Sequence, residues 1–419
     1  MHCLEKKVFY LRIIIIMVIL NSCYDEKLIV PEYGENVFNL ELNNSQVERI
    51  LESRGEQFYI SPLPGISYGD VPLQPDHIKI RGQSTLNFQR KSYSVNLDDV
   101  LVCETDSGNY IFIDKFKLLS LVYDYTYIEN RLSHLLLEEI GLWNLHTFYT
   151  QVVFNNEKHQ GLYLFVEDPE DYLIKNKNAE IVLRRHYSGE ISKIEHINGL
   201  TSSDSDKYVN DFNDIYSILP NYSGQQLYEK LQARMNINNY MKKMAFDYII
   251  KNGDTTDEIF FWAKKRNGHT YFDILPWDYD DIFSVVPHEI GRAWAVGKAF
   301  GERVYESHAD VLKELDGRLI FSVEDDIDYI IATDDYLYGK YLIQMQSVLR
   351  LFTPRFVEQT FNKLNNELGF YYGISEVIEQ STFDAGETSV ERFHENIQER
   401  RQFMLDRIQS IKFKMNDSK

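Results

Sequence analysis

Short stretches with strand-like spacing of apolar side chains fill much of the first half of the chain. In each of them, β-branched, aromatic or other apolar residues recur at every second position or form a brief run between turn-forming residues. The predicted strands cover residues 77–81, 90–97, 115–121, 147–154, 161–167 and 180–185. Asn155 and Asn156 separate two of them and favour a hairpin, whereas the Pro and Gly residues of 63–74 favour a loop.

Longer stretches, most of them in the second half, carry apolar residues at every third or fourth position. This spacing is typical of amphipathic helices. The predicted helices cover residues 43–54, 125–140, 208–218, 224–235, 237–251, 348–364 and 390–413. Gly141 follows the second of them and favours a helix end there. A strand-rich first half followed by a helical second half predicts an α+β protein.

The segment 246–283 combines a predicted hairpin with carboxylates at both of its ends. Aromatic and β-branched residues at 259–264 and 270–275 flank Asn267-Gly268, a pair typical of tight turns between antiparallel strands. The acidic residues at the two ends are Asp254, Asp257, Glu258, Asp278, Asp280 and Asp281. Because a hairpin brings its outer ends together, we expect these carboxylates to meet.

Carboxylates gathered at one place repel one another, which favours a hard cation such as Mg²⁺ between them. Magnesium in proteins commonly accompanies phosphate groups. The alternative at this stage is that the acidic residues are solvated turn formers at strand ends. A zinc site is not indicated, because the histidines show neither an H-E-x-x-H motif nor paired spacing.

A polar turn between the first two predicted strands is a second candidate for phosphate binding. It begins at Arg81 and contains the hydroxyl side chains of Ser84 and Thr85, and Lys91 follows it. Backbone N–H groups, these hydroxyls and Lys91 suit a phosphate. The alternative is that the hydroxyls complete the turn and Lys91 extends from a strand edge. Arg131, on a predicted helix, likewise points either into a cleft or to solvent.

Composition places the chain among globular proteins. Its 419 residues are 44% hydrophobic and 14% aromatic, which is too apolar for a disordered chain. The formal net charge of −20 argues against a nucleic-acid partner, because phosphate backbones require a positive surface. We expect a signal peptide at 1–22, a tether at 23–42, a β-rich part at 43–185 and a helical part with the acidic hairpin at 186–419.

The first 23 residues have the organisation of a secretory signal. A basic region within 1–12 precedes an apolar run at 13–20 that is too short to span a bilayer comfortably. The segment LNSC at 20–23 resembles a bacterial lipobox, which implies cleavage before Cys23 and a lipid on that cysteine. This predicts a lipoprotein of the bacterial cell envelope, anchored to a membrane outside the cytoplasm. The alternative is an N-terminal helix that is buried or that anchors the chain in a membrane.

Several stretches together resemble the CotH kinase-like family, named for a spore-coat protein. They are RGQSTLNFQRKSYSVNL at 81–97, KLLSLVYDYTYIENRLSHLLLEEIG at 117–141, VVFNNEKHQGLYLFVE at 152–167 and the segment 246–283, which ends in WDYDDIF. The sequence QERRQFMLDRIQSI resembles the closing helix of the family. The resemblance implies an atypical protein-kinase-like fold with a β-rich lobe and a mainly helical lobe. It also implies ATP and Mg²⁺ as cofactors and phosphorylation of protein serine or threonine hydroxyls.

The resemblance also implies roles for individual residues. Asp254 stands where the catalytic aspartate of the family receives the hydroxyl proton. Asp278 stands at the metal-binding aspartate, and Asp280 is a second metal contact. The residues expected to contribute to ATP binding are Arg81, Lys91, Arg131 and Glu167, the last as a partner of Lys91.

One position departs from the family pattern. Family members commonly place an asparagine about five residues after the catalytic aspartate, whereas this chain has Ile259 there. An aliphatic side chain cannot bind Mg²⁺. Either Asp257 or Glu258 takes over as metal ligand, or the site is impaired. Because the alignment across this turn can shift by one residue, Asp257 is also a candidate for the catalytic role.

Two other functions compete with the kinase hypothesis. A catalytically impaired surface lipoprotein would keep the fold and act in binding or adhesion; Ile259 and the lipid tether favour this reading. A metal-dependent hydrolase would use the same carboxylates without ATP.

Overall fold

The structure is a computed structural model of the chain. It describes residues 36–104, 108–124, 126–185, 191–197, 202–254, 259–287, 308–379 and 390–417. The predicted signal peptide and the predicted lipid site at Cys23 lie outside the described residues, and so do Asp257 and Glu258. Within the described ranges, every helix is too short or too polar to cross a membrane.

The larger sheet joins strands from the first part of the described chain. Within that part, eight strands follow one another in the order β3-β2-β1-β7-β8-β6-β5-β4. They are β1 (Val37–Glu41), β2 (Gly65–Tyr68), β3 (Val71–Leu73), β4 (Pro75–Arg81), β5 (Ser92–Glu104), β6 (Tyr110–Leu119), β7 (Thr147–Phe154) and β8 (Lys158–Glu167). Neighbouring strands are antiparallel except β1 and β7, which are parallel.

A smaller sheet contains the predicted acidic hairpin. Its order among the described residues is β10-β9-β11-β12. The strands are β9 (Ile181–Arg185), β10 (Ile191–Ile197), β11 (Ile259–Arg266) and β12 (His269–Pro276). In the hairpin β11–β12, Ile259 pairs with Pro276 at the open end. Asn267 and Gly268 form the turn with positive φ angles of 52° and 79°, a conformation that these two residue types adopt readily.

Helices make up most of the remaining structure. They are α2 (Asn44–Glu52), α3 (Glu129–Glu139), α4 (Pro169–Lys177), α5 (Ser202–Ile218), α6 (Gly224–Gln232), α7 (Ile237–Ile250), α8 (His308–Glu314), α9 (Asp326–Thr333), α10 (Asp335–Leu351), α11 (Pro354–Tyr371), α12 (Ser375–Glu379) and α13 (Val390–Asp417), with short 3₁₀ turns η1 (Ser84–Asn87) and η2 (Leu219–Asn221). The combination of a large sheet with many helices agrees with the predicted α+β class.

Two boundaries differ from the sequence prediction. The predicted loop at 63–74 contains β2 and β3, and the predicted tether at 23–42 contains β1. β1 pairs with β2 on one side and with β7 on the other. These strands are only three to five residues long, so they give little periodic signal, and their hydrogen-bond partners come from distant parts of the sequence.

The helix predicted at 348–364 is divided into α10 and α11. Pro354 is the first residue of α11, and the Thr353 side chain caps that helix by accepting the N–H of Phe356. A proline has no N–H to continue the preceding helix but fits the first turn of a new one. The apolar periodicity continued across the break and therefore concealed it. Within the part predicted to be helical, β11 and β12 are the predicted hairpin, whereas β10 was not predicted.

The central strand β8 separates two hydrophobic cores. Tyr163 and Phe165 pack into the core shared with α2, whereas Leu162, Leu164 and Val166 pack into the core shared with the helices. Both faces of this strand are therefore covered, which explains its continuous apolar sequence.

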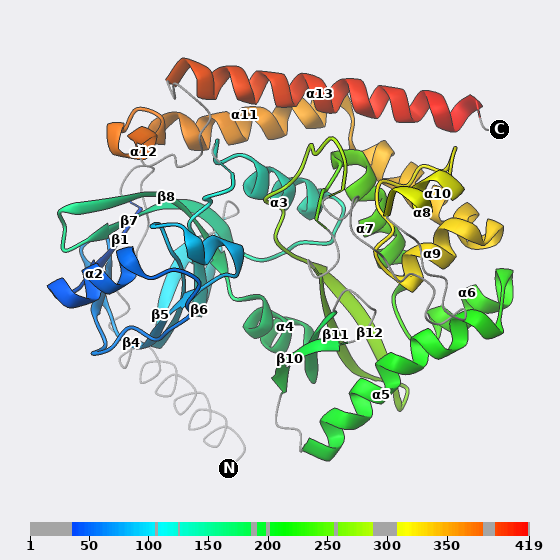
Figure 1. The fold of residues 1–419 in the computed structure, drawn as a ribbon, viewed down its shortest axis with the longest axis horizontal. Helices are drawn as coiled ribbons and strands as arrows, with labels where there is room; N and C mark the ends of the chain where they lie inside the picture. The colour runs from blue at the N-terminus through cyan, green and yellow to red at the C-terminus, as the bar shows by residue number, and fades with distance from the viewer. Residues whose placement is uncertain are drawn as a thin grey trace, which may run out of the picture.

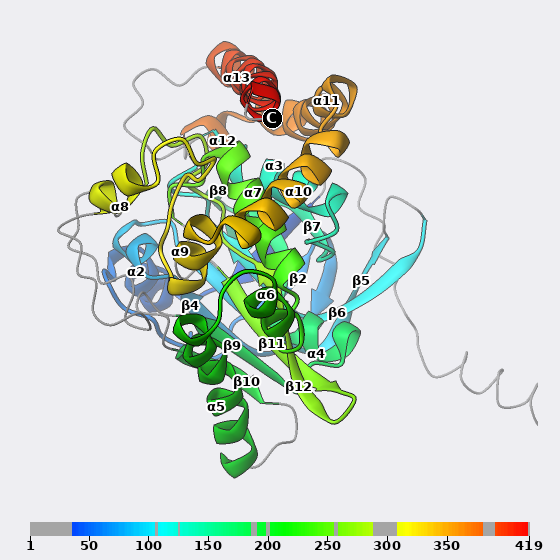
Figure 2. The same ribbon diagram turned by 90° about the vertical axis from the view of Figure 1, so that its right-hand side faces the viewer.

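The two sheets and the helices have separate places in the molecule. The larger sheet lies at one side, α6, α8, α9 and α10 lie at the other, and the smaller sheet lies between them (Figure 1). The helices α11 and α13 run across the top in Figure 1, and Figure 2 shows them next to each other along their length. This arrangement places the open end of the hairpin β11–β12 toward the middle of the molecule (Figure 1).

Candidate functional site

Backbone hydrogen bonds hold together the two chain segments that flank the hairpin β11–β12. Phe283 N donates to Ile250 O over 2.8 Å, and Gly253 N donates to Asp281 O over 2.8 Å. A Cβ atom on Gly253 would lie 1.6 Å from Asp281 Oδ2, so any larger residue at this position would force the Asp281 side chain to move. The two chain segments therefore meet as predicted next to Asp254, whereas Asp257 and Glu258 lie outside the described residues.

Four carboxylates gather where these segments meet. They belong to Asp254, Asp278, Asp280 and Asp281, here called the acidic mouth. Burial raises the pKa of Asp280 well above its ordinary value, and nearby negative charges raise it further. Those charges belong, in order of effect, to Asp278, Asp254, Asp124 and Asp281. The carboxylates thus lie close enough to repel one another.

The first turn of α3 holds the segment that follows β12. Asp124 stabilises this turn by accepting the N–H of Glu129 over 2.6 Å. From the same turn, Asn130 Oδ1 accepts Tyr279 N over 3.1 Å and Glu129 Oε2 accepts Ile282 N over 3.1 Å. The backbone that carries the acidic residues is therefore fixed to a helix rather than left as a free loop.

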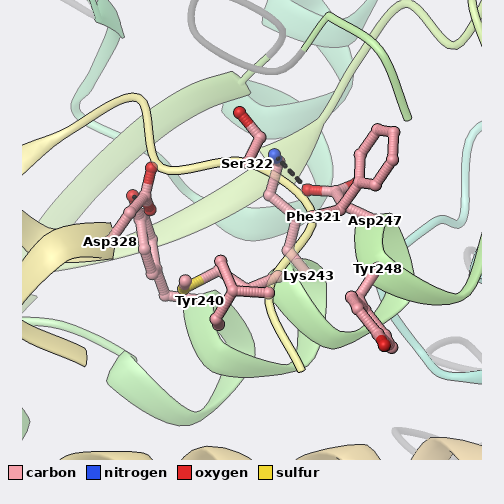
Figure 3. A pocket seen from close by; sticks show the side chains of 9 residues that line it. Tyr240, Lys243, Asp247, Tyr248, Phe321, Ser322 and Asp328 are labelled. Carbon is pink, nitrogen blue, oxygen red and sulfur yellow. Dashed lines mark hydrogen bonds and ion pairs between the residues drawn. The ribbon is translucent and has the colours of Figure 1, made fainter. Parts of the chain in front are cut away.

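Tyr279 is a fixed point between Asp278 and Asp280. Its side chain is fully buried, and its hydroxyl donates to Asp247 Oδ1 over 3.1 Å. Lys243 donates to Asp247 Oδ2 over 2.7 Å and balances its charge (Figure 3). Asp278 has a φ of 53°, which is uncommon for a residue other than glycine and tends to occur at functional sites. The anchored tyrosine therefore fixes the carboxylates on either side of it.

A small cavity lies beside the pair formed by Lys243 and Asp247 (Figure 3). Tyr240, Ser322 and Asp328 are among the residues that line it. Its volume is about 20 Å³, which suits about one water molecule. The cavity is too small for a nucleotide. It lies beside Asp247, the residue that holds the Tyr279 hydroxyl next to the acidic mouth.

Two basic side chains from the larger sheet lie near Trp277, the residue that precedes Asp278. The Arg81 guanidinium is 5.8 Å and the Lys117 ammonium 5.6 Å from the ring centroid of Trp277. Burial lowers the pKa of Arg81, while the nearby Asp278 opposes this shift. Within the described part of the chain, Arg81 makes no side-chain hydrogen bond or ion pair. Its N–H groups are therefore available to a ligand.

Lys117 is held by two carboxylates at the start of α4. Its Nζ donates to Asp168 Oδ2 over 2.7 Å and to Glu170 Oε2 over 2.8 Å. Burial alone would lower the pKa of Lys117, but these carboxylates outweigh it and the pKa is raised. The sequence prediction missed Lys117. A charged residue inside the apolar run of β6 is the signal that could have found it, because buried lysines are rarely unpaired.

Lys91 does not have the environment expected of a phosphate ligand. Its Nζ donates to the carbonyl oxygens of Ser53, Leu86 and Phe88 over 2.7, 2.6 and 2.5 Å. All three ammonium protons are used in this way, so the expected pairing with Glu167 does not form. Burial lowers the pKa of Lys91 to about 8. Of Lys91 and Lys117, it is Lys117 that lies beside Trp277, the residue that precedes Asp278.

Arg131 and Glu167 also have partners that were not predicted. Arg131 makes two hydrogen bonds to Glu367, over 2.7 and 2.8 Å, and one to Thr147 over 2.6 Å. These contacts join α3 to α11 and β7 and give Arg131 a structural role. Glu167 accepts a hydrogen bond from His146 N over 3.1 Å, and burial raises its pKa to about 7.

Close to Asp254 in the sequence, Asn252 has an amide oxygen that could bind a metal ion. Asn252 is fully buried, and among the described residues neither Oδ1 nor Nδ2 of its amide has a hydrogen-bond partner. Ile259 is buried and paired with Pro276 in the hairpin, so it supplies no ligand. No group of three or more acidic, histidine or cysteine side chains forms a ready metal site among the described residues.

We compared the sequence with known protein families and with curated proteins. The family model described as CotH kinase protein matches residues 78–410, which contain Arg81, Lys117 and the whole acidic mouth. A search of curated proteins gave no match. Because the matched range is far more than half of the sequence, the chain belongs to the CotH kinase protein family.

Proposed function

We propose that this protein is an ATP-dependent protein kinase that transfers a phosphoryl group to serine or threonine hydroxyls of a protein substrate. The observation that carries the proposal is the proximity of Arg81 to Asp278 of the acidic mouth, with Lys117 beside Trp277, the residue that precedes Asp278. Phosphoryl transfer needs this combination, since it depends on charge compensation and alignment rather than on covalent chemistry by the protein.

The donors of the acidic mouth fit Mg²⁺. They are all carboxylate oxygens, and Asn252, two residues before Asp254, has an amide oxygen with no hydrogen-bond partner among the described residues. Mg²⁺ prefers oxygen and commonly binds through one or two carboxylates together with water and phosphate, so a cage of protein ligands is not required. Asp278 and Asp280 would hold the ion. When bound, it would neutralise charge on the phosphates of ATP.

Arg81 and Lys117 would bind the phosphates from the side of the larger sheet. Arg81 has free N–H groups, and Lys117 can exchange one carboxylate partner for a phosphate oxygen. The nucleotide would then lie between a β-rich lobe, formed by the larger sheet, and a mainly helical lobe. Lys91, Arg131 and Glu167 would support this arrangement without touching the nucleotide.

Asp254 would align the substrate hydroxyl. Its carboxylate would accept the hydroxyl proton while a bond forms between the hydroxyl oxygen and the terminal phosphorus. The bond from that phosphorus to the bridging oxygen breaks at the same time, and ADP leaves with the electron pair. The packing of Gly253 against Asp281 keeps Asp254 next to the residues that follow β12.

The N-terminal sequence supports a position outside the cytoplasm. Cleavage before Cys23 and lipidation of this cysteine would anchor the kinase to a membrane of the bacterial cell envelope. The negative net charge of −20 favours a protein partner over nucleic acid.

The test is transfer of label from the γ-phosphate of ATP to protein hydroxyls in the presence of Mg²⁺. We expect transfer by the wild type and a loss of at least about a hundredfold in Asp254→Asn and Asp278→Asn. Asp316→Asn is the matched control, because Asp316 is exposed, and it should keep full activity. Equal transfer by all four proteins, or by none of them, would refute the proposal.

A second candidate function is a binding module that keeps the fold but does not transfer phosphate. Ile259 favours it, since this buried residue replaces an expected metal ligand. Such a module would bind a cell-surface protein or glycan without any change in its stability on addition of Mg²⁺ and ATP. A nucleotide effect on stability that disappears in Asp278→Asn would reject it.

A further inference from the structure

A larger cavity lies at the turn end of the hairpin β11–β12, opposite the end that carries the acidic mouth. Its volume is about 450 Å³. Three segments form its wall: α5, the connection between α6 and α7, and the turn itself, which lies beside α5 (Figure 1). Its charged and imidazole side chains are Lys207, Asp211, Asp214, Arg234, Lys265 and His269. We call it the turn pocket.

Hydrogen bonds fix the three walls of the turn pocket to one another. Thr270 on β12 donates its hydroxyl to Asp211 on α5. Phe272 N donates to Arg234 O over 2.8 Å, and Asn236 N donates to Phe272 O over 2.8 Å, which ties the connection between α6 and α7 to β12. The pocket is therefore bounded by paired secondary structure.

Part of the charge in the turn pocket is already compensated. Asp211 accepts from Thr270 and lies 4.0 Å from Lys265 Nζ, which itself donates to Thr270 Oγ1 over 2.7 Å. Within the described part of the chain, Lys207 and His269 make no side-chain hydrogen bond or ion pair. Arg234 makes one long side-chain hydrogen bond, of 3.4 Å, to a backbone carbonyl.

The cationic groups are concentrated relative to the rest of the chain. Lys and Arg account for 44 of 419 residues, and the chain has a net charge of −20. In the turn pocket, three of the lining residues are Lys or Arg, and a histidine adds a fourth nitrogen donor. An acidic protein that leaves basic side chains uncompensated around a cavity favours the binding of an anion there.

We propose that the turn pocket binds a small ligand that carries phosphate or carboxylate groups, with Lys207, Arg234 and His269 as its donors. The volume lies within the range of small-molecule sites, and the charged lining favours a polar, multiply charged ligand. Each strand of the hairpin has eight residues, so the pocket lies about 25 Å from the acidic mouth. It is therefore separate from the proposed ATP site.

Asp214 gives the proposal an additional test. This exposed carboxylate lines the same pocket and would repel an anion. Asp214→Asn should therefore tighten binding, whereas loss of Lys207 and Arg234 should weaken it. A general change in folding would weaken binding in all of these variants, so it would not produce tighter binding in one and weaker binding in the other.

The experiment uses the full chain with pyrophosphate and with citrate as probes. Binding is measured by calorimetry and by the NMR signal of the His269 imidazole, which His269→Gln identifies. We expect at least one probe to shift this signal, and the double variant Lys207→Gln with Arg234→Gln to weaken binding at least about tenfold. Asp214→Asn should bind more tightly than the wild type. A response to pyrophosphate alone identifies phosphate as the ligand chemistry, and a response to citrate alone identifies carboxylate.

The double variant Lys158→Gln with Arg355→Gln is the matched control. Both residues are exposed and lie outside the turn pocket, so the same change in net charge should leave binding unaltered. A His269 signal that neither probe moves would overturn the proposal, even if calorimetry detects heat from another site. Equal weakening by both double variants would overturn it as well, since binding would then depend only on net charge.

Discussion

At the scale of single residues, the substitution Gly253→Ala tests how tightly the two acidic segments are packed. In Gly253→Ala the new Cβ would meet Asp281 Oδ2 at 1.6 Å and Ser284 Oγ at 2.6 Å. Asp281 must then turn away from the acidic mouth. We expect the free energy of unfolding to fall by about 1 kcal/mol, measured by chemical denaturation. The rate of phosphoryl transfer should also fall, and by more than the small increase in the fraction of unfolded protein would cause.

Gly369→Ala is the matched control for this substitution. Gly369 lies in α11, and a Cβ there would have no atom within 4 Å. Because alanine is a better helix former than glycine, this variant should be more stable by up to about 1 kcal/mol. If the two alanine variants shift stability in the same direction, the packing at Gly253 has no special role.

Single residues were predicted from the sequence only where local geometry decides their place. The sequence predicted that Asp254 and Asp278 lie close together, because a hairpin brings the residues at its two open ends next to each other. The choice between Lys91 and Lys117 could not be made in this way. It depends on which carbonyls and carboxylates surround each ammonium. For Lys91 one of these is Ser53, 38 residues away at the end of α2, and for Lys117 they are Asp168 and Glu170 at the start of α4, 51 and 53 residues away.

At the scale of elements, the first turn of α3 decides how firmly the acidic segment is held. Asp124 accepts N–H groups of this turn, and Glu129 and Asn130 within it hold the backbone after β12. Asp124→Ala should lower the free energy of unfolding by about 2 kcal/mol, measured by chemical denaturation. Asp124→Asn keeps an acceptor oxygen and should lose less. Equal losses in both variants would mean that the cap does not stabilise α3.

Elements with a strong local signal were predicted well, and elements defined by distant partners were not. The hairpin β11–β12 follows from apolar runs around Asn267-Gly268, and α2 follows from its periodicity after Asn43. In contrast, β1 has only five residues, and its place between β2 and β7 follows from pairing over long sequence distances. The division of α10 from α11 has a clear local cause in Pro354, which the continuous apolar pattern obscured.

At the scale of the whole molecule, buried carboxyl groups predict a stability that falls as pH rises toward neutrality. Burial raises the pKa of Glu167 from 4.5 to about 7 and that of Asp325 from 3.8 to about 6. Between about pH 4 and 7 the unfolded chain has already lost these protons while the folded chain keeps them, so the free energy of unfolding decreases. The melting temperature should therefore be lower at pH 8 than at pH 5.5.

Glu167→Gln isolates one part of this pH dependence. The amide oxygen of glutamine can still accept His146 N but does not ionise. The variant should gain stability relative to the wild type at pH 8, by about 1 to 2 kcal/mol, and little at pH 4. An unchanged difference between the two proteins from pH 4 to pH 8 would show that Glu167 does not titrate as its burial implies.

The central claim is that the acidic mouth and the basic pair Arg81 and Lys117 bind Mg²⁺ and ATP together. The most direct measurement is the melting temperature of the full chain with ATP, in the presence of Mg²⁺ or of a chelator. We expect the melting temperature to rise only when ATP and Mg²⁺ are both present. The rise should correspond to about 2.7 kcal/mol of additional free energy of unfolding when ATP is at a hundredfold excess over its Kd. The rise should disappear in Asp278→Asn and shrink in Arg81→Gln. An unchanged melting temperature in the wild type, or an equal rise in Asp278→Asn, would contradict the central claim.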